Sequence, residues 1–320
     1  MNARATDAYL ARFQKVLAYI DANLSDDLTV ARLSEVAAFS KHHFLRQFSE
    51  LFGIGVYKYV QLCRLKRASY QLAFRDDRTV TDIALDSGYD NAESFSRAFK
   101  KSAGQTPSEF RKQPHWEPWR HTYEPLTALR TRYMQTEPSH RDIRIEHFPE
   151  TRVAVLEHRG DPDRLGDSIR AFIAWRKQHH LHPSRHATFN IFYDDPYQVA
   201  PADYRLDLCV AVDRSLGDEV SGIVDKAIPE GRCAVLRHVG SDDHLHAAIA
   251  YLYAQWLPQS GEEPRDFPLF VQRLRFYPDV AEHEAVVDVF LPLKWRTNLD
   301  GHPNLCIPVQ SARFQYRQGL

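Results

Sequence analysis

Residues 88–111 read GYDNAESFSRAFKKSAGQTPSEFR, and this segment contains a tight turn followed by an amphipathic helix. Gly88 suits a turn that needs a positive φ, and Asp90 is of a residue type that caps the start of a helix. Phe95 and Phe99 are one helical turn apart, so both are expected to face the core while the polar residues between them point outward. The segment therefore predicts the second part of a helix-turn-helix unit.

A matching unit lies about 50 residues earlier in the chain. TVARLSEVAAFS (residues 29–40) corresponds to TVTDIALDSGYD (residues 79–90), with Ser40 in the capping position. Phe44 and Phe48 then repeat the phenylalanine pair of the later helix. One such unit would fit an ordinary helical bundle equally well, but two matching units favour a tandem helix-turn-helix domain.

The segment from Gly88 to Arg111 closely resembles the signature of the AraC/XylS family of bacterial transcription regulators. The resemblance covers about residues 8–112. It implies two recognition helices that enter successive major-groove segments on one DNA face, joined by a long helix around residues 56–74. Ala38 departs from the family, where glycine is frequent in the first turn. The module usually comes last in the family, whereas here it comes first, as in the Rob-like subgroup.

The resemblance also implies which side chains meet DNA. Arg46 and Arg97 are predicted to read guanine, because an arginine fork matches the O6 and N7 acceptors. The lysines of these helices are expected to contact phosphate, which sets affinity rather than sequence preference. The alternative is that the lysines are solvated surface residues and that the arginines pair with acids. The predicted DNA-binding residues are Lys41, His42, Leu45, Arg46, Ala92, Glu93, Ser94, Arg97, Lys100 and Lys101.

Charge is distributed unevenly over the 320 residues. The formal net charge is only −1, but residues 1–113 carry a net charge of +4 and residues 142–295 a net charge of −8. This asymmetry fits a first half that binds nucleic acid and a second half with a different role.

The composition excludes several classes of protein. A hydrophobic content of 43% and a charged content of 26% are ordinary for a globular protein and argue against general disorder. No apolar run approaches the ~18 residues of a membrane span, and the first residues lack the apolar core of a signal peptide. The four scattered cysteines form no C-x-x-C pair, which predicts reduced thiols. The expected location is the bacterial cytoplasm, in association with the nucleoid.

The second half of the chain is also a duplication. PETRVAVLEHRG (residues 149–160) matches PEGRCAVLRHVG (residues 229–240), and the 27 positions that begin with these stretches share 12 identities. Each copy continues into a helical pattern and then into two β-rich runs. The pattern predicts an α+β domain of two β-α-β-β units, related by a pseudo-two-fold axis with a groove between them.

This region, residues 142–295, resembles the GyrI-like effector-binding domain, mainly through YDDP (residues 193–196) and DVFLPL (residues 288–293). The family binds small amphipathic or cationic molecules between its halves, through a carboxylate and aromatic walls. Asp288 takes the place of the glutamate that is common in the family, and Asp207 is its counterpart in the first copy, so either acid could be structural. The predicted ligand-binding residues are Trp175, Tyr193, Trp256, Tyr277, Asp288 and Phe290.

The predicted organisation is an all-α tandem helix-turn-helix domain followed by an α+β domain. The AraC-type domain spans residues 8–113 and the GyrI-like domain residues 142–295. Residues 114–141 form a linker whose prolines argue against helix interior, and residues 296–320 form a C-terminal tail.

These features predict a sequence-specific transcription regulator, an activator or a repressor, whose second domain binds a small effector. The expected partners are double-stranded promoter or operator DNA, the effector and RNA polymerase, with no membrane. No cofactor or metal is expected, since His179, His180 and His182 lack a cysteine or carboxylate at ligand spacing. One alternative makes the second domain a protein-docking module. Another makes it a GyrI-like hydrolase, although no nucleophile–histidine constellation is readable and an enzyme is not the prediction.

Overall fold

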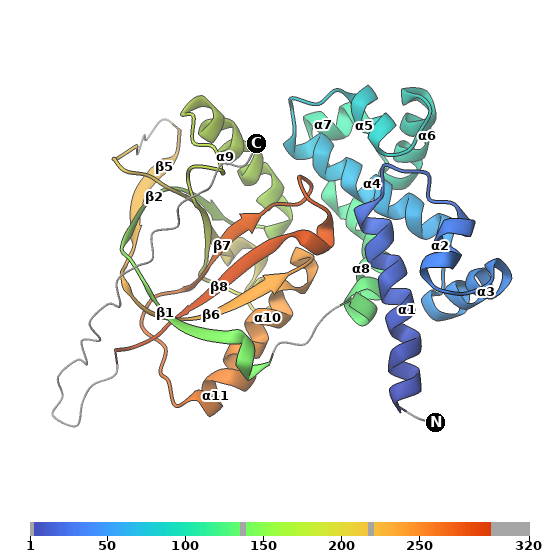
Figure 1. Cartoon of the computed structure of the whole chain (residues 1–320). Coiled ribbons are helices and arrows are strands. Elements are labelled where there is room, and N and C mark those ends of the chain that lie inside the picture. The colour runs from blue at the N-terminus through green and yellow to red at the C-terminus, as the bar shows by residue number, and fades with distance from the viewer. Residues whose placement is uncertain (1–2, 135–138, 217–220, 296–320) are drawn as a thin grey trace, which may run out of the picture.

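The structure is a computed structural model in which residues 3–134, 139–216 and 221–295 are described (Figure 1). A helical domain and an α+β domain lie side by side. The predicted tail, residues 296–320, lies outside the described residues. None of the described helices combines the length and the apolar composition that a membrane span requires.

The helical domain contains both predicted helix-turn-helix units, as α2–α3 and α5–α6, and the predicted long helix between them is α4. Apolar side chains of α1 and α4 are buried together in one core: Phe13, Val16, Leu17 and Ile20 of α1, and Leu62, Leu65, Ala68 and Leu72 of α4. The helices are α1 (Ala3–Ala22), α2 (Val30–Val36), α3 (Lys41–Phe52), α4 (Val56–Phe74), α5 (Val80–Asp86), α6 (Ala92–Ala103), α7 (Pro107–Lys112) and α8 (Trp116–Met134).

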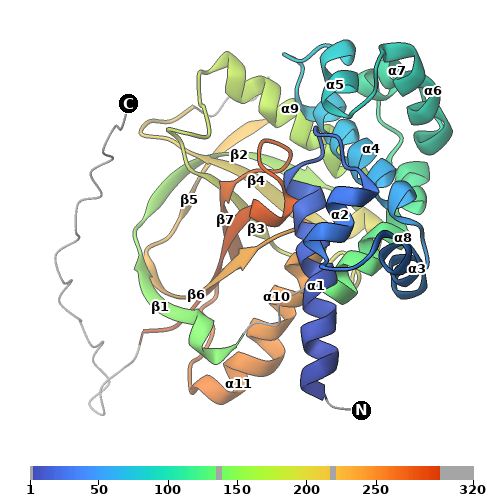
Figure 2. The same cartoon turned by 45° about the vertical axis from the view of Figure 1, so that its right-hand side comes forward.

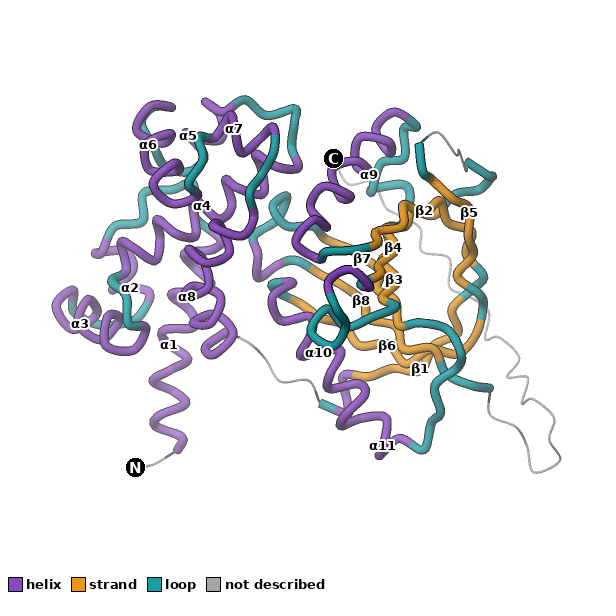
Figure 3. The backbone as a smooth tube through the Cα atoms, turned by 180° about the vertical axis from the view of Figure 1, so that it is seen from behind, coloured by secondary structure: helices purple, strands orange, loops and turns teal. Residues whose placement is uncertain are grey.

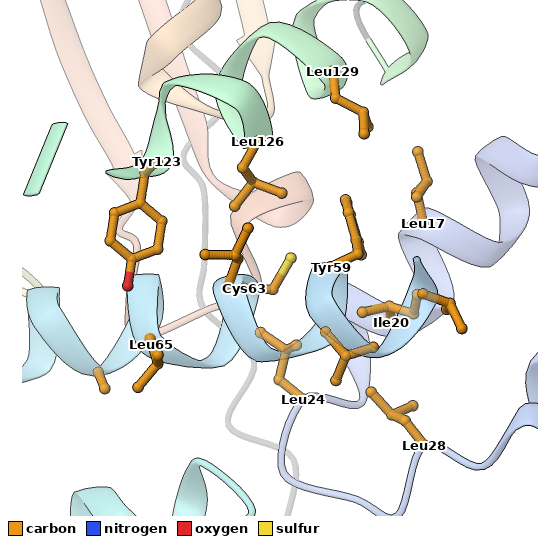
Figure 4. Packing of buried hydrophobic residues seen from close by; sticks show 14 of the residues in the cluster. Leu17, Ile20, Leu24, Leu28, Tyr59, Cys63, Leu65, Tyr123, Leu126 and Leu129 are labelled. Atoms are coloured by element: carbon orange, nitrogen blue, oxygen red, sulfur yellow. The ribbon is translucent and has the colours of Figure 1, made fainter. Parts of the chain in front are cut away.

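Helix α8 corrects the expectation that the proline-rich segment is not helical. Pro118 falls in the first helical turn, where the missing amide hydrogen would have no partner in any case. Pro125 lies inside the helix, and packing compensates for its lost hydrogen bond. Tyr123 and Leu126 of α8 are buried over α4, next to side chains such as Cys63 (Figure 4). The segment is therefore a packed part of the helical domain rather than an extended connection.

The α+β domain is built on an eight-stranded antiparallel sheet with the strand order β1-β6-β8-β7-β3-β4-β2-β5. Its strands are β1 (Ile143–Phe148), β2 (Thr151–Arg159), β3 (Thr188–Phe192), β4 (Arg205–Ala211), β5 (Ile223–Ile228), β6 (Gly231–Val239), β7 (Leu269–Arg275) and β8 (Val286–Pro292). Its main helices are α9 (Leu165–Gln178) and α10 (Leu245–Tyr251), the latter continuing through the π-helical turn η5 (Leu252–Trp256) into α11 (Leu257–Ser260).

The two repeats are more intertwined than the predicted β-α-β-β units. The α+β class is confirmed, but each repeat begins with one additional strand, β1 or β5. Strand β1 pairs with β6 of the second repeat, and β5 pairs with β2 of the first (Figure 3). The strand order is symmetric about the β7–β3 contact, as a pseudo-two-fold axis requires. Each repeat thus lends its first strand to the other.

The two faces of the sheet have different coverings. Helices α9 and α10 lie on the side of the sheet that faces the helical domain (Figures 1 and 2). Two apolar clusters form beneath them, one per repeat. Side chains alternate between faces along a strand, so the intervening positions point to the other side, which we call the effector face. A third cluster, drawn from both repeats and centred on Phe270 and Phe290, lies there.

The domains meet through a buried group of charged side chains, which we call the interdomain ion cluster. Lys66 of α4 donates to Asp243 and to Glu282 of the α+β domain, both at 2.8 Å. Arg130 of α8 donates to both oxygens of Asp21 on α1, at 2.8 and 2.6 Å, and lies 3.3 Å from Glu282. Lys66, Arg130 and Asp21 are each only 3% exposed. The cluster therefore joins three helices of one domain to the other domain.

Electrostatics keeps this cluster ionised. Burial alone would raise the pKa of Glu282, but Lys66 and Arg130 outweigh burial and lower the pKa to about 2. Burial alone would lower the pKa of Lys66, but Glu282 and Asp243 outweigh it and raise that pKa.

The turn of the first helix-turn-helix unit supports a stability prediction. Ala38 is exposed and has φ +53°, whereas the corresponding position of the second unit is Gly88 at +72°. A non-glycine residue in this region costs ~1–2 kcal/mol, partly offset by the greater chain entropy of glycine. We expect Ala38→Gly to raise the free energy of unfolding by about 0.5–1 kcal/mol in urea titrations.

Gly88→Ala is the matched variant. It should lower the free energy of unfolding by about 1–2 kcal/mol or more, because the new methyl would also lie 2.5 Å from the Arg64 guanidinium. A less stable Ala38→Gly protein would contradict the explanation.

The depressed pKa of Glu282 predicts a pH dependence. Its contribution to stability is present above its usual pKa near 4.5 and is lost as the pH falls toward about 2. We expect Glu282→Gln to cost roughly 3 kcal/mol at neutral pH, because it leaves Lys66 and Arg130 under-compensated. The difference from the unmodified protein should shrink as urea titrations move from about pH 6 to about pH 3. A difference that stays constant over that interval would exclude an ionised Glu282.

Candidate DNA-binding helices and effector face

The two helix-turn-helix units share their local hydrogen bonds. Thr29 and Thr79 cap α2 and α5, and Thr79 forms a reciprocal capping box with Asp82. Ser40 caps α3 as predicted. Asn91, rather than the predicted Asp90, caps α6 by accepting from the amide of Ser94 at 2.8 Å. Each unit thus begins its second helix with a side-chain cap, two residues after the turn at Ala38 in the first unit and three residues after Gly88 in the second.

Both second helices have a buried face and an exposed face. Phe44 and Phe48 in α3, and Phe95 and Phe99 in α6, are fully buried. Most of the predicted DNA-binding residues are exposed on the opposite side, and Ala92 and Ser94 are half-buried there. The structure therefore brings the predicted set onto two outward helix faces, as Lys41, His42, Leu45 and Arg46 on α3 and Ala92, Glu93, Ser94, Arg97, Lys100 and Lys101 on α6.

The two arginines have different surroundings. Arg97 lies 3.3 Å from Glu93 one turn earlier, and both side chains remain largely exposed. For Arg46, no hydrogen bond or ion pair is found within the described residues. Helix α6 also ends in Lys100 and Lys101, which add positive charge next to the arginine. Both guanidinium groups are accessible to an anionic partner, although Arg97 would have to give up its exposed ion pair with Glu93 in order to bind one.

The first repeat places a charged group at one end of the effector face. Asp207, 2% exposed, accepts from Lys226 at 2.6 Å and from the Tyr193 hydroxyl at 2.9 Å. Lys226 also lies 2.6 Å from Glu157. The Lys226 ammonium and the Arg205 guanidinium lie 5.5 and 5.4 Å from the centre of the Tyr193 ring. The chain therefore supplies its own cations to the carboxylate and to the aromatic ring.

The second repeat has the corresponding carboxylate with a different partner. Asp288 receives two hydrogen bonds of 2.7 Å from Arg237 on the neighbouring strand. The Arg237 side chain is half exposed, whereas that of Asp288 is 9% exposed. Phe290 stacks on Phe270 of the neighbouring strand β7, with a centroid distance of 4.9 Å, and both rings belong to the second repeat. The face thus has an aromatic centre, with one neutralised carboxylate belonging to each repeat.

The pKa shifts follow from these pairs. Burial alone would lower the pKa of Lys226, but hydrogen bonds to Asp207 and Glu157 outweigh it and raise the pKa. The hydrogen bond from Lys226 in turn lowers the pKa of Glu157. Burial, followed by the hydrogen bond to Asp207, raises the pKa of Tyr193. At neutral pH the group is an ionised lysine held by two carboxylates and a neutral tyrosine.

The structure does not bring all six predicted ligand-binding residues together. Tyr193, Asp288 and Phe290 share the effector face. Trp175 and Trp256 pack under the helices, in the two clusters on the opposite side of the sheet. These tryptophans follow the helical spacing of the core residues, which explains their position.

Tyr277 lies elsewhere again. Its ring is 5.0 Å from that of Tyr70 on α4, so it contributes to the contact between the domains. A pocket at this junction is lined by Tyr70, residues 240–243, Arg273, Arg275, Phe276, Tyr277, Glu282, Ala285 and Val287.

Several residues of these sites were not singled out from the sequence. On the effector face they are Glu157, Arg205, Lys226 and Arg237, and at the domain junction Lys66, Arg130 and Glu282. One signal was available for Lys66: it interrupts the apolar stripe of α4 on its buried side. A charge at such a position indicates a buried partner.

Comparison with known proteins identifies the same two modules. Residues 141–294 match the family model described as a GyrI-like small-molecule-binding domain, and residues 33–113 match a helix-turn-helix domain model. The probable transcriptional regulator YgiV of Escherichia coli (strain K12) is 36% identical over 153 residues, which cover 48% of this chain and 96% of that protein. An uncharacterized HTH-type transcriptional regulator of Staphylococcus aureus (strain COL) is 35% identical over 100 residues, 31% of this chain and 13% of that protein.

The solved structures that match this chain include the cryo-EM structure of the EcmrR–DNA complex in EcmrR-RPo. The two chains are 15% identical, and the alignment covers 83% of this chain and 98% of the EcmrR chain, with a TM-score of 0.41. The alignment with YgiV spans nearly the whole relative, and the matched helix-turn-helix domain (residues 33–113) precedes the matched GyrI-like domain (residues 141–294) in this chain. The chain therefore belongs to the transcription regulators that join an AraC-type helix-turn-helix domain to a GyrI-like small-molecule-binding domain.

Proposed function

We propose that the chain is a sequence-specific regulator that reads promoter or operator DNA with α3 and α6 and binds a small effector on the effector face. The observation that carries the first part is the pair of matched units, each with a buried phenylalanine face and an exposed polar face. RNA polymerase is the further partner that a promoter-bound activator would contact, and the bacterial cytoplasm is the location that this role requires.

The two recognition surfaces are different, so the proposed DNA site is asymmetric. Helix α3 presents His42, Leu45 and Arg46, whereas α6 presents Glu93 and Arg97. Arginine reads guanine through O6 and N7, glutamate accepts from cytosine N4, and leucine contacts the thymine methyl. Two such units in one chain can read two half-elements without a dimer, whereas single-unit repressors depend on two-fold symmetry.

The effector site is proposed on the shared face of the two repeats. Interfaces between repeats are common sites for small molecules, and this face combines an aromatic centre with paired charges. Lys226 and Arg205 both lie over the Tyr193 ring, and Lys226 also pairs with the Asp207 carboxylate. A cationic effector would therefore have to displace a cation of the chain itself. An amphipathic molecule that uses the aromatic centre and exchanges one ion pair fits the arrangement.

Arginine recognition of a selected DNA site can be tested directly. Selection of bound DNA from a random pool should enrich an asymmetric motif with two half-elements about 10 base pairs apart. On that motif, Arg46→Ala or Arg97→Ala should weaken binding by about 1–3 kcal/mol at fixed salt, as measured by fluorescence anisotropy. Random DNA should be affected much less.

Arg46→Lys is the matched control, because it keeps the charge and loses the planar fork. It should bind random DNA normally and still lose affinity for the motif. Equal losses on both DNAs for the alanine variants would mean that the arginines contact phosphate. Failure to enrich any motif would refute sequence-specific reading.

The effector site generates a further prediction about Lys226. Lys226→Met removes the cation that Asp207 and Glu157 share and leaves these two carboxylates open to another one. A panel of small organic ammonium compounds, tested by thermal shift, should then bind about 3-fold or more tightly than to the unmodified chain. The isosteric neutral compounds serve as controls and should show no such gain. Weaker binding of the ammonium compounds to the variant would show that Lys226 is itself a ligand-binding group.

A further inference from the structure

The two repeats contact the helical domain in equivalent loops but by different means. In the first repeat, Asp163 pairs with Arg120 of α8, and both side chains are 47% exposed. Its counterpart in the second repeat, Asp243, pairs with Lys66, which is buried. The short helix η6 (Glu282–Glu284) supplies the second partner of Lys66, and the matching helix η3 (Pro201–Asp203) has proline where η6 has Glu282. Only the second repeat therefore contributes a buried carboxylate to the interdomain ion cluster.

The segments that hold this cluster are hydrogen-bonded to each other and lead directly into strands β6 and β8 of the effector face. The Ser241 hydroxyl donates to Glu282 at 2.6 Å, and the amide of Gly240 donates to the carbonyl of Ala285 at 2.9 Å. Strands β6 and β8 then pair directly, and two residues farther along this ladder is the Arg237–Asp288 pair. Strands β6 and β8 therefore connect the two groups. The loops at their ends contribute to the interdomain ion cluster, and the strands themselves carry the Arg237–Asp288 pair of the effector face.

We propose that the Arg237–Asp288 pair controls the interdomain ion cluster through the shared ends of β6 and β8. The inference rests on the proposed function, since an effector group that takes Arg237 or Asp288 as its partner is what would break the pair. Breaking it removes two hydrogen bonds between β6 and β8 next to the loops that carry Asp243 and Glu282. Those loops then hold Lys66 and Arg130 less tightly, and the helical domain is released.

The nature of the interface suits such a release. Buried ion pairs stabilise an interface little compared with apolar packing, because charges regain hydration when the surfaces separate. Lys66 lies on α4, which joins the two helix-turn-helix units, and Asp21 lies on α1 of the same domain. An effector that binds the separated and the closed arrangements with different affinity would shift the balance between them.

Chemical labelling of lysine in the full-length chain tests this proposal. The Lys66 ammonium is enclosed by the cluster, whereas Lys100 is exposed on α6. With an amine-reactive reagent and mass spectrometry, we expect Asp288→Asn and Arg237→Gln to raise the labelling rate of Lys66 by about 5-fold or more. The rate at Lys100 should stay unchanged. Glu282→Gln, which opens the cluster directly, is the positive control.

The repeat supplies a matched negative control. Asp207→Asn breaks the corresponding charge pair on β4, and Lys226→Gln does so from the other side. Neither should accelerate labelling of Lys66, because the ends of β2 and β4 carry no part of the cluster. Equal acceleration by both sets of variants would indicate general loosening of the sheet and would overturn the proposal. No acceleration by either Asp288→Asn or Arg237→Gln would also overturn it.

This readout needs neither DNA nor an effector, so it separates the two ideas. If no small molecule binds the face, the proposed effector role fails while the labelling result still decides the coupling. If small molecules bind but the labelling rate of Lys66 is unchanged when the Arg237–Asp288 pair is broken, the effector role stands and the coupling fails.

Discussion

The contact between Lys66 and Glu282 determines how the two domains of this chain are held. Lys66 is on the helix that joins the two helix-turn-helix units, and Glu282 is next to the strand that carries Asp288. Both groups are taken out of water, so each depends on the other to remain charged. Such a contact fixes the relative orientation of the two domains more strongly than it adds stability. Any other orientation would leave an unpaired charge in the interface, which is costly. The position of the DNA-binding surfaces relative to the effector face follows from this pairing.

Helix α8 makes that pairing possible. It packs its apolar side on α4 and α1, as Figure 4 shows for Leu126 and Leu129, and it brings Arg130 to within reach of both Asp21 and Glu282. A flexible linker in the same place could not hold a guanidinium group 3% exposed between two domains. The segment that joins the domains in sequence is therefore also one of the surfaces that join them in space.

Much of the helical domain follows from local patterns, and the failures have identifiable causes. The phenylalanine pairs and the turn at Gly88 are short-range signals, so both helix-turn-helix units could be predicted from them. In α8, two prolines concealed the spacing of Trp119, Tyr123 and Leu126, which is itself helical. Strands β1 and β5 pair across repeats, and such long-range pairing leaves no signal in their own short sequences. The sequence does not show on which side of the sheet an aromatic side chain will lie. For this reason the predicted ligand-binding set combined Phe290 with Trp175 and Trp256, which lie on the helices of the opposite side.

The duplication gives a further way to separate structural residues from functional ones. Positions that perform the same structural task in both repeats should remain similar, as the paired acids Asp207 and Asp288 do. Positions that differ mark where one repeat has taken a separate role: Glu282 stands against Pro201, and Arg237 against Glu157. Both differences lie on or beside the β6–β8 pair of the second repeat, and Glu282 also contacts the helical domain. The asymmetry of the repeats thus coincides with the path by which a bound molecule could influence DNA binding.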